Sequence, residues 1–86
     1  MELAPEEMKR IVVRMKRAHG HLGSVIRMIE EGAECEDVLT QLAAVNKALA
    51  RSAFAIVATG LEQCLRDDDT DTVDRARLEK LFLALA

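Results

Sequence analysis

Apolar residues recur at intervals of three and four along the first third of the chain. Within residues 5–31 they fall on one face of a helix, at Met8, Ile11, Met15, Ala18, Leu22, Val25, Ile26 and Ile29. Such spacing is typical of an amphipathic helix with one buried stripe. Pro5 followed by Glu6 and Glu7 suits the start of this helix, and Gly32 suits its end.

The second segment predicts a long helix that is apolar on nearly all sides. It begins near residues 35–37 and runs without proline to residue 66. Between residues 38 and 61 the only charged side chains are Lys47 and Arg51. A helix that is apolar nearly all round is buried on several sides, and two short neighbours within one chain cannot cover it. We therefore expect an oligomer.

The last segment predicts a third helix after an acidic turn. Residues 67–71 read Asp-Asp-Asp-Thr-Asp, and Thr70, Asp71 or Thr72 can cap a helix that runs to the end of the chain. Its apolar stripe consists of Val73, Leu78, Leu81, Phe82 and Leu85. No segment has the alternating pattern of a strand, so the expected fold is an all-α, three-helix protomer.

Composition narrows the class of protein. The chain has 86 residues, 50% apolar and 31% charged, which favours one small globular domain over residues 1–86. Its longest uncharged run, residues 52–61, is too short to cross a bilayer, and no basic segment leads into an apolar signal region. We expect a cytoplasmic protein without a membrane partner. An enzyme is not expected, because no acid/base pair, nucleophile-base pair or phosphate loop is present.

The net charge of −3 conceals a strong segregation of charge. The stretch of residues 9–27 contains two histidines and no carboxylate, and its six cationic residues are Lys9, Arg10, Arg14, Lys16, Arg17 and Arg27. The acidic residues collect near residues 30–37 and 62–74. This asymmetry is typical of a surface that binds a polyanion. A solvated helix face would give the same pattern, and charge alone leaves both interpretations open.

A helical wheel arranges part of this block as a ridge. Arg10, Arg14, Arg17 and His21 follow one another at spacings of four, three and four residues, away from the apolar stripe. Lys9, Lys16 and Arg27 flank them, and Arg51 and Lys47 extend the surface from the second helix. In the absence of a recognition helix, such a ridge would contact DNA phosphates more than base edges.

The two cysteines cannot meet within one chain. Twenty-nine residues separate Cys35 from Cys64, and at the rise of an α-helix they lie about 43 Å apart. In an antiparallel dimer, however, Cys35 of one chain lies beside Cys64 of the other. The alternative is that both are small buried hydrophobic residues.

Several motifs together resemble the CsoR/RcnR/FrmR family of bacterial repressors. They are Arg14-x-Lys16-Arg17-x-x-Gly20, the run from Cys35 through Asp37-Val38-Leu39-Thr40-Gln41-Leu42, Ala44-Val45, and Ala48-Leu49-x-Arg51. The resemblance implies antiparallel helix-pair dimers that assemble into tetramers. It also implies a repressor that binds operator DNA and releases it on binding copper, nickel, formaldehyde or sulfur species. Arg14 and Arg51 match basic positions used for DNA in the family, whereas Asn46 stands where a basic residue is common.

The sensing residues depart from the pattern of the family's copper sensors. Their Cys, His and Cys ligands correspond to Cys35, Gly60 and Cys64, so the middle donor is missing. The remaining pair resembles the persulfide-sensing CstR subgroup, in which sulfane sulfur modifies two facing thiols without any cofactor or metal. Gly60 would then leave room for extra sulfur atoms, or would merely permit close helix packing.

Two other functions remain open from the sequence. The first is a Cu(I)-responsive repressor in which Cys35 and Cys64 bind the metal as a reduced ligand set. The second is a helical oligomerisation module that does not bind DNA. The sequence favours the thiol-based repressor over both.

Overall fold

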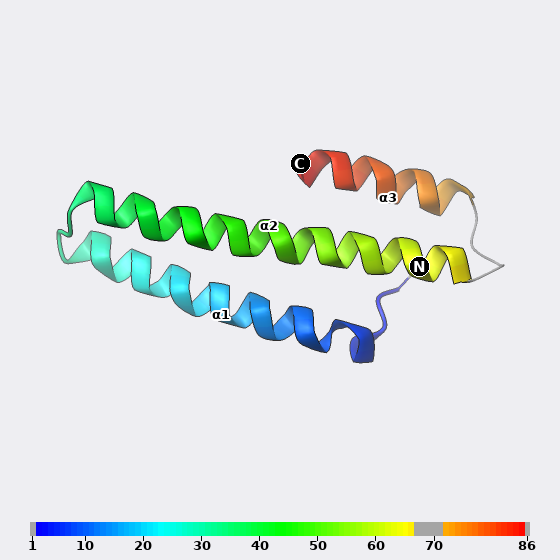
Figure 1. Cartoon of the computed structure of the whole chain (residues 1–86), viewed down its shortest axis with the longest axis horizontal. Helices are drawn as coiled ribbons and strands as arrows, with labels where there is room; N and C mark the ends of the chain where they lie inside the picture. Colours follow the sequence, from blue (N-terminus) through cyan, green and yellow to red (C-terminus); the bar gives the residue numbers. More distant parts are fainter. Residues whose placement is uncertain (1, 67–71, 86) are drawn as a thin grey trace.

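A computed structural model shows three helices in chain order (Figure 1). They are α1 (Pro5–Glu30), α2 (Cys35–Arg66) and α3 (Thr72–Leu85). The structure describes residues 2–66 and 72–85, and it leaves aside the side chains of residues 63–66 and 72–74. Within the described ranges there is no strand, so the predicted all-α class is confirmed. The predicted caps Thr70 and Asp71 lie outside the described residues.

The start of α1 agrees with the local sequence. Ala4 occupies the N-cap position without a side-chain hydrogen bond, and Pro5 follows in the first turn. The backbone amides of Glu7 and Met8 donate to the Ala4 carbonyl at 3.0 and 3.2 Å. Proline loses no hydrogen bond in this position, and the carboxylates of Glu6 and Glu7 oppose the positive end of the helix dipole.

A glycine ends α1 and reverses the chain. Gly32 has φ +77°, a left-handed conformation that side chains with a Cβ rarely adopt. Its amide donates to the carbonyl of Ile29 at 3.1 Å, and the amide of Ala33 donates to that of Met28 at 2.9 Å. These two bonds form a Schellman motif. The motif confirms the predicted end of the first helix and lets α2 begin at Cys35.

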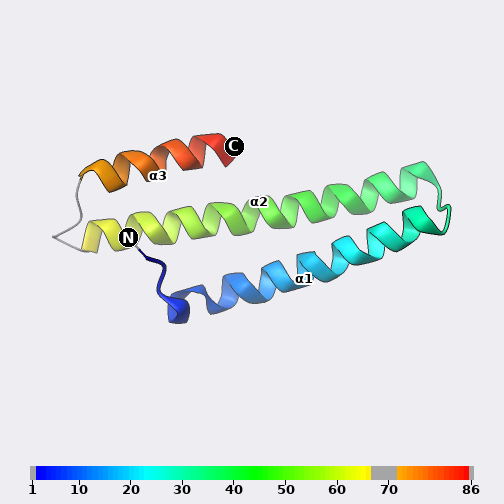
Figure 2. The same cartoon turned by 180° about the vertical axis from the view of Figure 1, so that it is seen from behind.

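The three helices lie side by side in a flat layer. Figures 1 and 2 show α2 in the middle, with α1 antiparallel along one side and α3 antiparallel along its C-terminal half on the other. The Cα atoms extend over 54 × 25 × 14 Å, and the shortest dimension is close to the width of one helix with its side chains, about 10–12 Å. The two broad faces of α2 are therefore not covered by this chain.

This flatness makes the core narrower than the sequence predicts. The buried apolar residues of the described chain are Met8, Ile11, Ala18, Val25, Val45, Val57 and Leu78. Met15, Ile26 and Ile29 of the predicted stripe are instead 38%, 49% and 59% exposed. A single neighbouring helix contacts only the centre of an apolar stripe, so residues at its edges stay accessible.

The contact between α2 and α3 is built from few side chains. Leu78 is buried against α2, and the rings of Phe54 and Phe82 meet edge to face with centroids 5.4 Å apart. Leu81 and Leu85 of the predicted third stripe are exposed, because α3 presents only one narrow edge to α2.

One part of α2 is long and apolar enough to cross a membrane by length and composition. Residues Cys35–Glu62 reach a mean hydropathy of 1.2, and 17% of an 18-residue stretch within them is buried. Length and composition therefore do not exclude a span by themselves, contrary to the sequence expectation. Lys47 and Arg51 lie inside this segment, and a cation at the centre of a span costs about 2.5–3.5 kcal/mol. The core helix of an oligomer has the same length and apolar composition as such a span.

Candidate nucleic-acid interface and sensor residues

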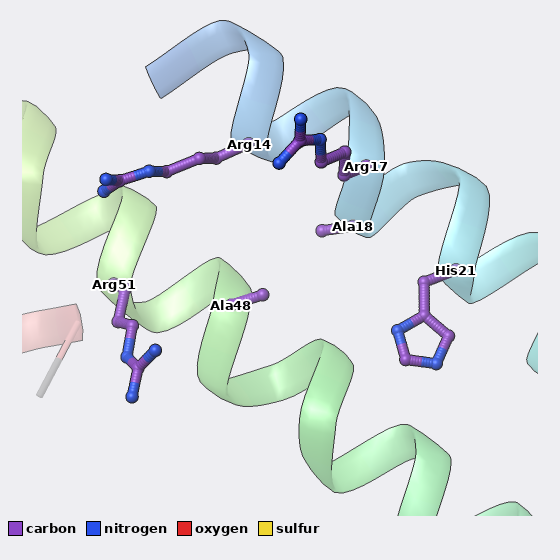
Figure 3. Close-up of a pocket in the computed structure, with 6 residues that line it drawn as sticks. All are labelled: Arg14, Arg17, Ala18, His21, Ala48 and Arg51. Carbon is purple, nitrogen blue, oxygen red and sulfur yellow. The ribbon is translucent and has the colours of Figure 1, made fainter. Parts of the chain in front are cut away.

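A basic cleft runs between α1 and α2. Its lining residues are Arg14, Arg17, Ala18 and His21 from α1 and Ala48 and Arg51 from α2, around a volume of about 410 Å³ (Figure 3). The two alanines form the floor, where the helices approach, and the long side chains stand around it. The structure thus brings Arg51 to the predicted ridge, although it lies thirty positions after His21, the last residue of the ridge.

A second hollow continues this basic surface towards the N-terminus. Lys9, Arg10, Val13, Arg14 and Arg17 line it, around a volume of about 400 Å³. Because Arg14 and Arg17 line both hollows, the two form one continuous surface. Lys47 is exposed one turn before Arg51 but does not line the basic cleft.

The charges of the cleft are not neutralised by neighbouring carboxylates. Among the side chains that the structure describes, the one ion pair joins Lys9 to Glu6 at 2.9 Å, on the exposed first turns of α1. Arg14, Arg17 and Arg51 therefore present their full charge to solvent. Three unpaired guanidinium groups around one cleft favour an anionic partner with phosphate geometry.

A hydrogen bond closes one end of the cleft. His21 Nε2 of α1 and Gln41 Oε1 of α2 are 2.6 Å apart. Helical spacing predicts His21 on the ridge but assigns no role to Gln41. Gln41 lies seven residues before Ala48, a spacing that keeps both on the face of α2 towards α1, and this was the signal available in the sequence.

An apolar groove lies along the same two helices, on another side of Ala18. Its volume is about 500 Å³, and its lining consists of Val12, Met15, Lys16, Ala18, His19, Leu22 and Leu49. Lys16 was predicted among the DNA-binding residues, but the structure places it in this groove and not in the basic cleft. Neighbouring residues on a helix point about 100° apart, which separates Lys16 from Arg17.

The first predicted sensing residue is accessible. Cys35 is exposed at the first position of α2, beside the turn that joins α1 to α2. Glu36 and Asp37 occupy the same helical turn. The thiol can therefore meet a ligand, an oxidant or a second chain without any rearrangement of its own helix.

The second cysteine lies at the opposite end of α2. One continuous helix of 32 residues contains both Cys35 and Cys64, which confirms that they cannot meet within the chain. The thiol of Cys64 is outside the side chains that the structure describes, so the predicted pairing between chains stays a prediction.

Gly60 is buried where α2 meets α3. A Cβ atom added there would lie 3.4 Å from Leu78 Cδ2 and 3.5 Å from Leu78 Cδ1. Such a methyl group makes ordinary contact, but a longer side chain meets the leucine directly. Of the two interpretations of Gly60, the structure therefore favours close helix packing over room for additional atoms.

Within one protomer, the described side chains do not form a metal site. No group of three or more His, Cys, Asp or Glu residues among them is placed to hold a metal ion. Cys35 supplies one sulfur donor and Gly60 supplies none. A Cu(I) ion, which accepts few and soft ligands, would therefore need thiolates from two chains.

Comparison with known proteins identifies similar repressors. The family model for the metal-sensitive transcriptional repressors matches residues 7–86. The copper-sensing transcriptional repressor CsoR of Mycobacterium ulcerans (strain Agy99) is 38% identical over 72 residues, which are 84% of this chain and 62% of that protein. Its namesake in Mycobacterium tuberculosis (strain ATCC 25618 / H37Rv) is 35% identical over 72 residues, 84% of this chain and 60% of that protein. The chain thus spans about three-fifths of the length of these relatives.

A shorter relative matches more closely along its own length. YrkD of Bacillus subtilis (strain 168), an uncharacterised protein, is 42% identical over 53 residues, which are 62% of this chain and 84% of that protein. No solved structure matches the chain. The two repressors above are described as copper-sensing.

Proposed function

Because this chain belongs to the family of metal-sensitive transcriptional repressors, we propose that it binds operator DNA in the cytoplasm and releases it on binding Cu(I). Residues 1–86 form a single domain that contains both the DNA surface and the sensing thiols. The observation that carries the proposal is the basic cleft between α1 and α2, found in a chain similar to copper-sensing repressors over 84% of its length.

The DNA surface consists of the basic cleft and the hollow beside it. Arg10, Arg14 and Arg17 supply charge from α1, and Arg51 supplies it from α2. Lys47 extends the surface at its border. Contacts of this kind bind phosphates and respond strongly to salt, whereas sequence preference comes in part from DNA shape.

The functional unit is a homodimer or homotetramer. Twelve large apolar residues are exposed on the described chain, among them Val12, Met15 and Leu49 beside the apolar groove. A soluble monomer rarely leaves so much apolar surface uncovered. An antiparallel pair of α2 helices would cover the exposed apolar residues of α2 and bring Cys35 of one chain to Cys64 of the other.

Cu(I) would act at this pair of cysteines. Two thiolates suffice to hold Cu(I), for which thiolate is a preferred ligand. Cu(I) draws the two chains together at each end of the α2 pair, and this changes the distance and orientation between their basic clefts. Release of DNA then follows from a difference in Cu(I) affinity between the free and the DNA-bound oligomer.

Fluorescence anisotropy tests the proposal. An operator duplex is first selected from random DNA with the purified protein, and Cu(I) is then added to the complex in the absence of oxygen. We expect stoichiometric Cu(I) to release the DNA from wild type but not from Cys35→Ser. Failure of Cu(I) to release the DNA from wild type would contradict the proposed inducer.

A second candidate inducer is sulfane sulfur, which needs two thiols and no third ligand. Gly60 has no donor atom and the side chain of Leu78 lies over it, so residue 60 supplies no third ligand to a metal. Attack of the Cys35 thiolate on a polysulfide transfers one sulfur atom and leaves a shorter polysulfide. Attack of Cys64 from a second copy on the resulting persulfide then forms a disulfide and releases hydrosulfide.

Polysulfide in the same anisotropy assay separates the two inducers. If sulfane sulfur is the inducer, polysulfide releases the DNA, Cu(I) does not, and a covalent dimer forms on non-reducing gels. Mass spectrometry would then locate the bridge between Cys35 and Cys64 of different chains. Cys35→Ser and Cys64→Ser must each abolish that dimer.

A further inference from the structure

The hydrogen bond between His21 and Gln41 has no part in the function proposed above. The acceptor Oε1 is an amide oxygen, which cannot donate, so the His21 Nε2 carries the proton and donates across 2.6 Å. One residue comes from α1 and the other from α2. The bond therefore fixes the orientation of the imidazole from the neighbouring helix.

Fixing the ring in this way directs its other nitrogen at the basic cleft. In Figure 3 one ring nitrogen of His21 lies on the side of Ala18 and Ala48, and the other lies on the far side. Since Nε2 is bound to Gln41, the nitrogen nearer the cleft is Nδ1. An imidazole ring that carries both protons donates from each nitrogen, so Nδ1 can donate to an oxyanion in the cleft while Nε2 donates to Gln41.

The other groups in the cleft suit the same ligand. Arg14, Arg17 and Arg51 are the charged residues in its lining, and no carboxylate contributes to that lining. Guanidinium groups match phosphate oxygens through paired hydrogen bonds. The volume of about 410 Å³ exceeds that of one phosphate and leaves room for the sugars on either side of it.

We propose that the basic cleft seats one phosphate group, bound by guanidinium groups of its lining and hydrogen bonded by His21, which Gln41 orients. Gln41 is thus a positioning residue, acting through His21. That the phosphate belongs to a DNA backbone rests on the function proposed above. A free phosphate has the same chemistry, and the experiment separates the two sources.

The first arm uses the DNA-free protein. Inorganic phosphate replaces chloride at constant ionic strength while NMR follows the side-chain resonances of both histidines. His19 is the matched control, because it lies on the same helix but lines the apolar groove. We expect phosphate to shift the resonances of His21 and to leave those of His19 in place, and we expect Gln41→Leu to reduce that shift.

The second arm measures affinity for a fluorescein-labelled duplex of random sequence. Six proteins are compared: wild type, His21→Ala, Gln41→Leu, the double variant, Gln41→Glu and His19→Ala. His21→Ala should weaken binding about five- to tenfold, and the double variant should bind no more weakly than His21→Ala alone, since Gln41 acts through His21. Gln41→Glu keeps an acceptor oxygen and should bind better than Gln41→Leu. His19→Ala should bind as wild type, and circular dichroism should show unchanged helicity throughout.

The two arms separate the two proposals. A shift of His21 by phosphate in a protein that binds no DNA supports the phosphate site and refutes the DNA-binding function. Responses in both arms support the site with DNA as its source. Equal shifts of both histidines, absence of any shift, or an additive double variant would overturn the proposal.

Discussion

The two grooves along α1 and α2 share Ala18 but have opposite chemistry. The basic cleft is lined by the three guanidinium groups of Arg14, Arg17 and Arg51. The apolar groove is lined mainly by aliphatic side chains, and Lys16 and His19 are its polar members. One pair of helices therefore offers one surface suited to a polyanion and another suited to a second copy of the protein.

Position on the helix, more than local composition, creates this difference. Arg14 and Met15 are neighbours in sequence, yet the first lines the basic cleft and the second lines the apolar groove. The same holds for Lys16 and Arg17. A rotation of about 100° per residue distributes one basic stretch over both grooves, so a cluster of charges in sequence is not one surface in space.

The largest effect is expected from removing the apolar character of the groove. Val12 and Leu49 are 42% and 40% exposed in the protomer, and assembly gains this fraction of the about 1.5–3 kcal/mol that full burial of such a side chain contributes, in each of two copies. The double variant Val12→Gln/Leu49→Gln should weaken assembly by about a hundredfold or more, as measured by analytical ultracentrifugation. DNA affinity should fall with it.

Val13→Gln is the control for this variant. Val13 is 50% exposed beside Val12 but lines the second hollow, the one next to the basic cleft. The oligomer of Val13→Gln should therefore keep the wild-type mass. If Val12→Gln/Leu49→Gln also keeps the wild-type mass at the lowest concentration, the apolar groove is not an interface between copies.

The next largest effect concerns the cleft itself. Arg14→Ala and Arg51→Ala should each weaken DNA binding about tenfold, as expected when a charge-assisted hydrogen bond is removed. The slope of log affinity against log salt should also fall by about 0.9 for each phosphate that the variant no longer neutralises. Lys16→Ala removes the same charge from the apolar groove and should have a smaller effect on both quantities. Equal effects of all three variants would mean that only net charge matters.

Substitutions of Gly60 test the apolar packing of α2 against α3. Because Leu78 lies over Gly60, Gly60→His alone should disturb the contact of α2 with α3. Gly60→His/Leu78→Ala makes room for the imidazole and adds a nitrogen donor near Cys64. Competition with a Cu(I) chelator should then show binding about tenfold tighter or more than in the matched Leu78→Ala protein. Unchanged affinity would place residue 60 outside the copper site.

The smallest effect is expected from Gly60→Ala. The added methyl group makes ordinary contact with Leu78, and alanine is favoured over glycine in a helix by about 1 kcal/mol. Urea denaturation should therefore show stability raised by up to about 1 kcal/mol. A decrease in stability would mean that the close approach of α2 and α3 requires the glycine.

Local features of the chain could be predicted from the sequence because they depend on neighbouring residues. Pro5 begins α1, Gly32 ends it, and the basic ridge follows from helical spacing. The register between α1 and α2 is a property of the folded hairpin. The contact of His21 with Gln41 depends on this register, so it was not foreseen.

The packing of α3 against α2 could not be predicted from the local sequence either. The antiparallel course of α3 along α2 places Leu78 over Gly60. Helical spacing identified Leu81 and Leu85 as apolar but could not show that both stay exposed beside α2. The residues at the edges of the first apolar stripe were expected to be buried, and the flat layer of helices explains why they are exposed.

Hydroxyl-radical footprinting with mass spectrometry tests the division between the two grooves most directly. The full-length protein is oxidised with and without DNA, and the modification of each side chain is compared. We predict that Met15 and Leu49 are protected before DNA is added, by a second copy of the chain, and that His21 and Val13 become protected only with DNA. Protection of Met15 by DNA, or protection of His21 in its absence, would contradict the assignment of the basic cleft to DNA and of the apolar groove to assembly.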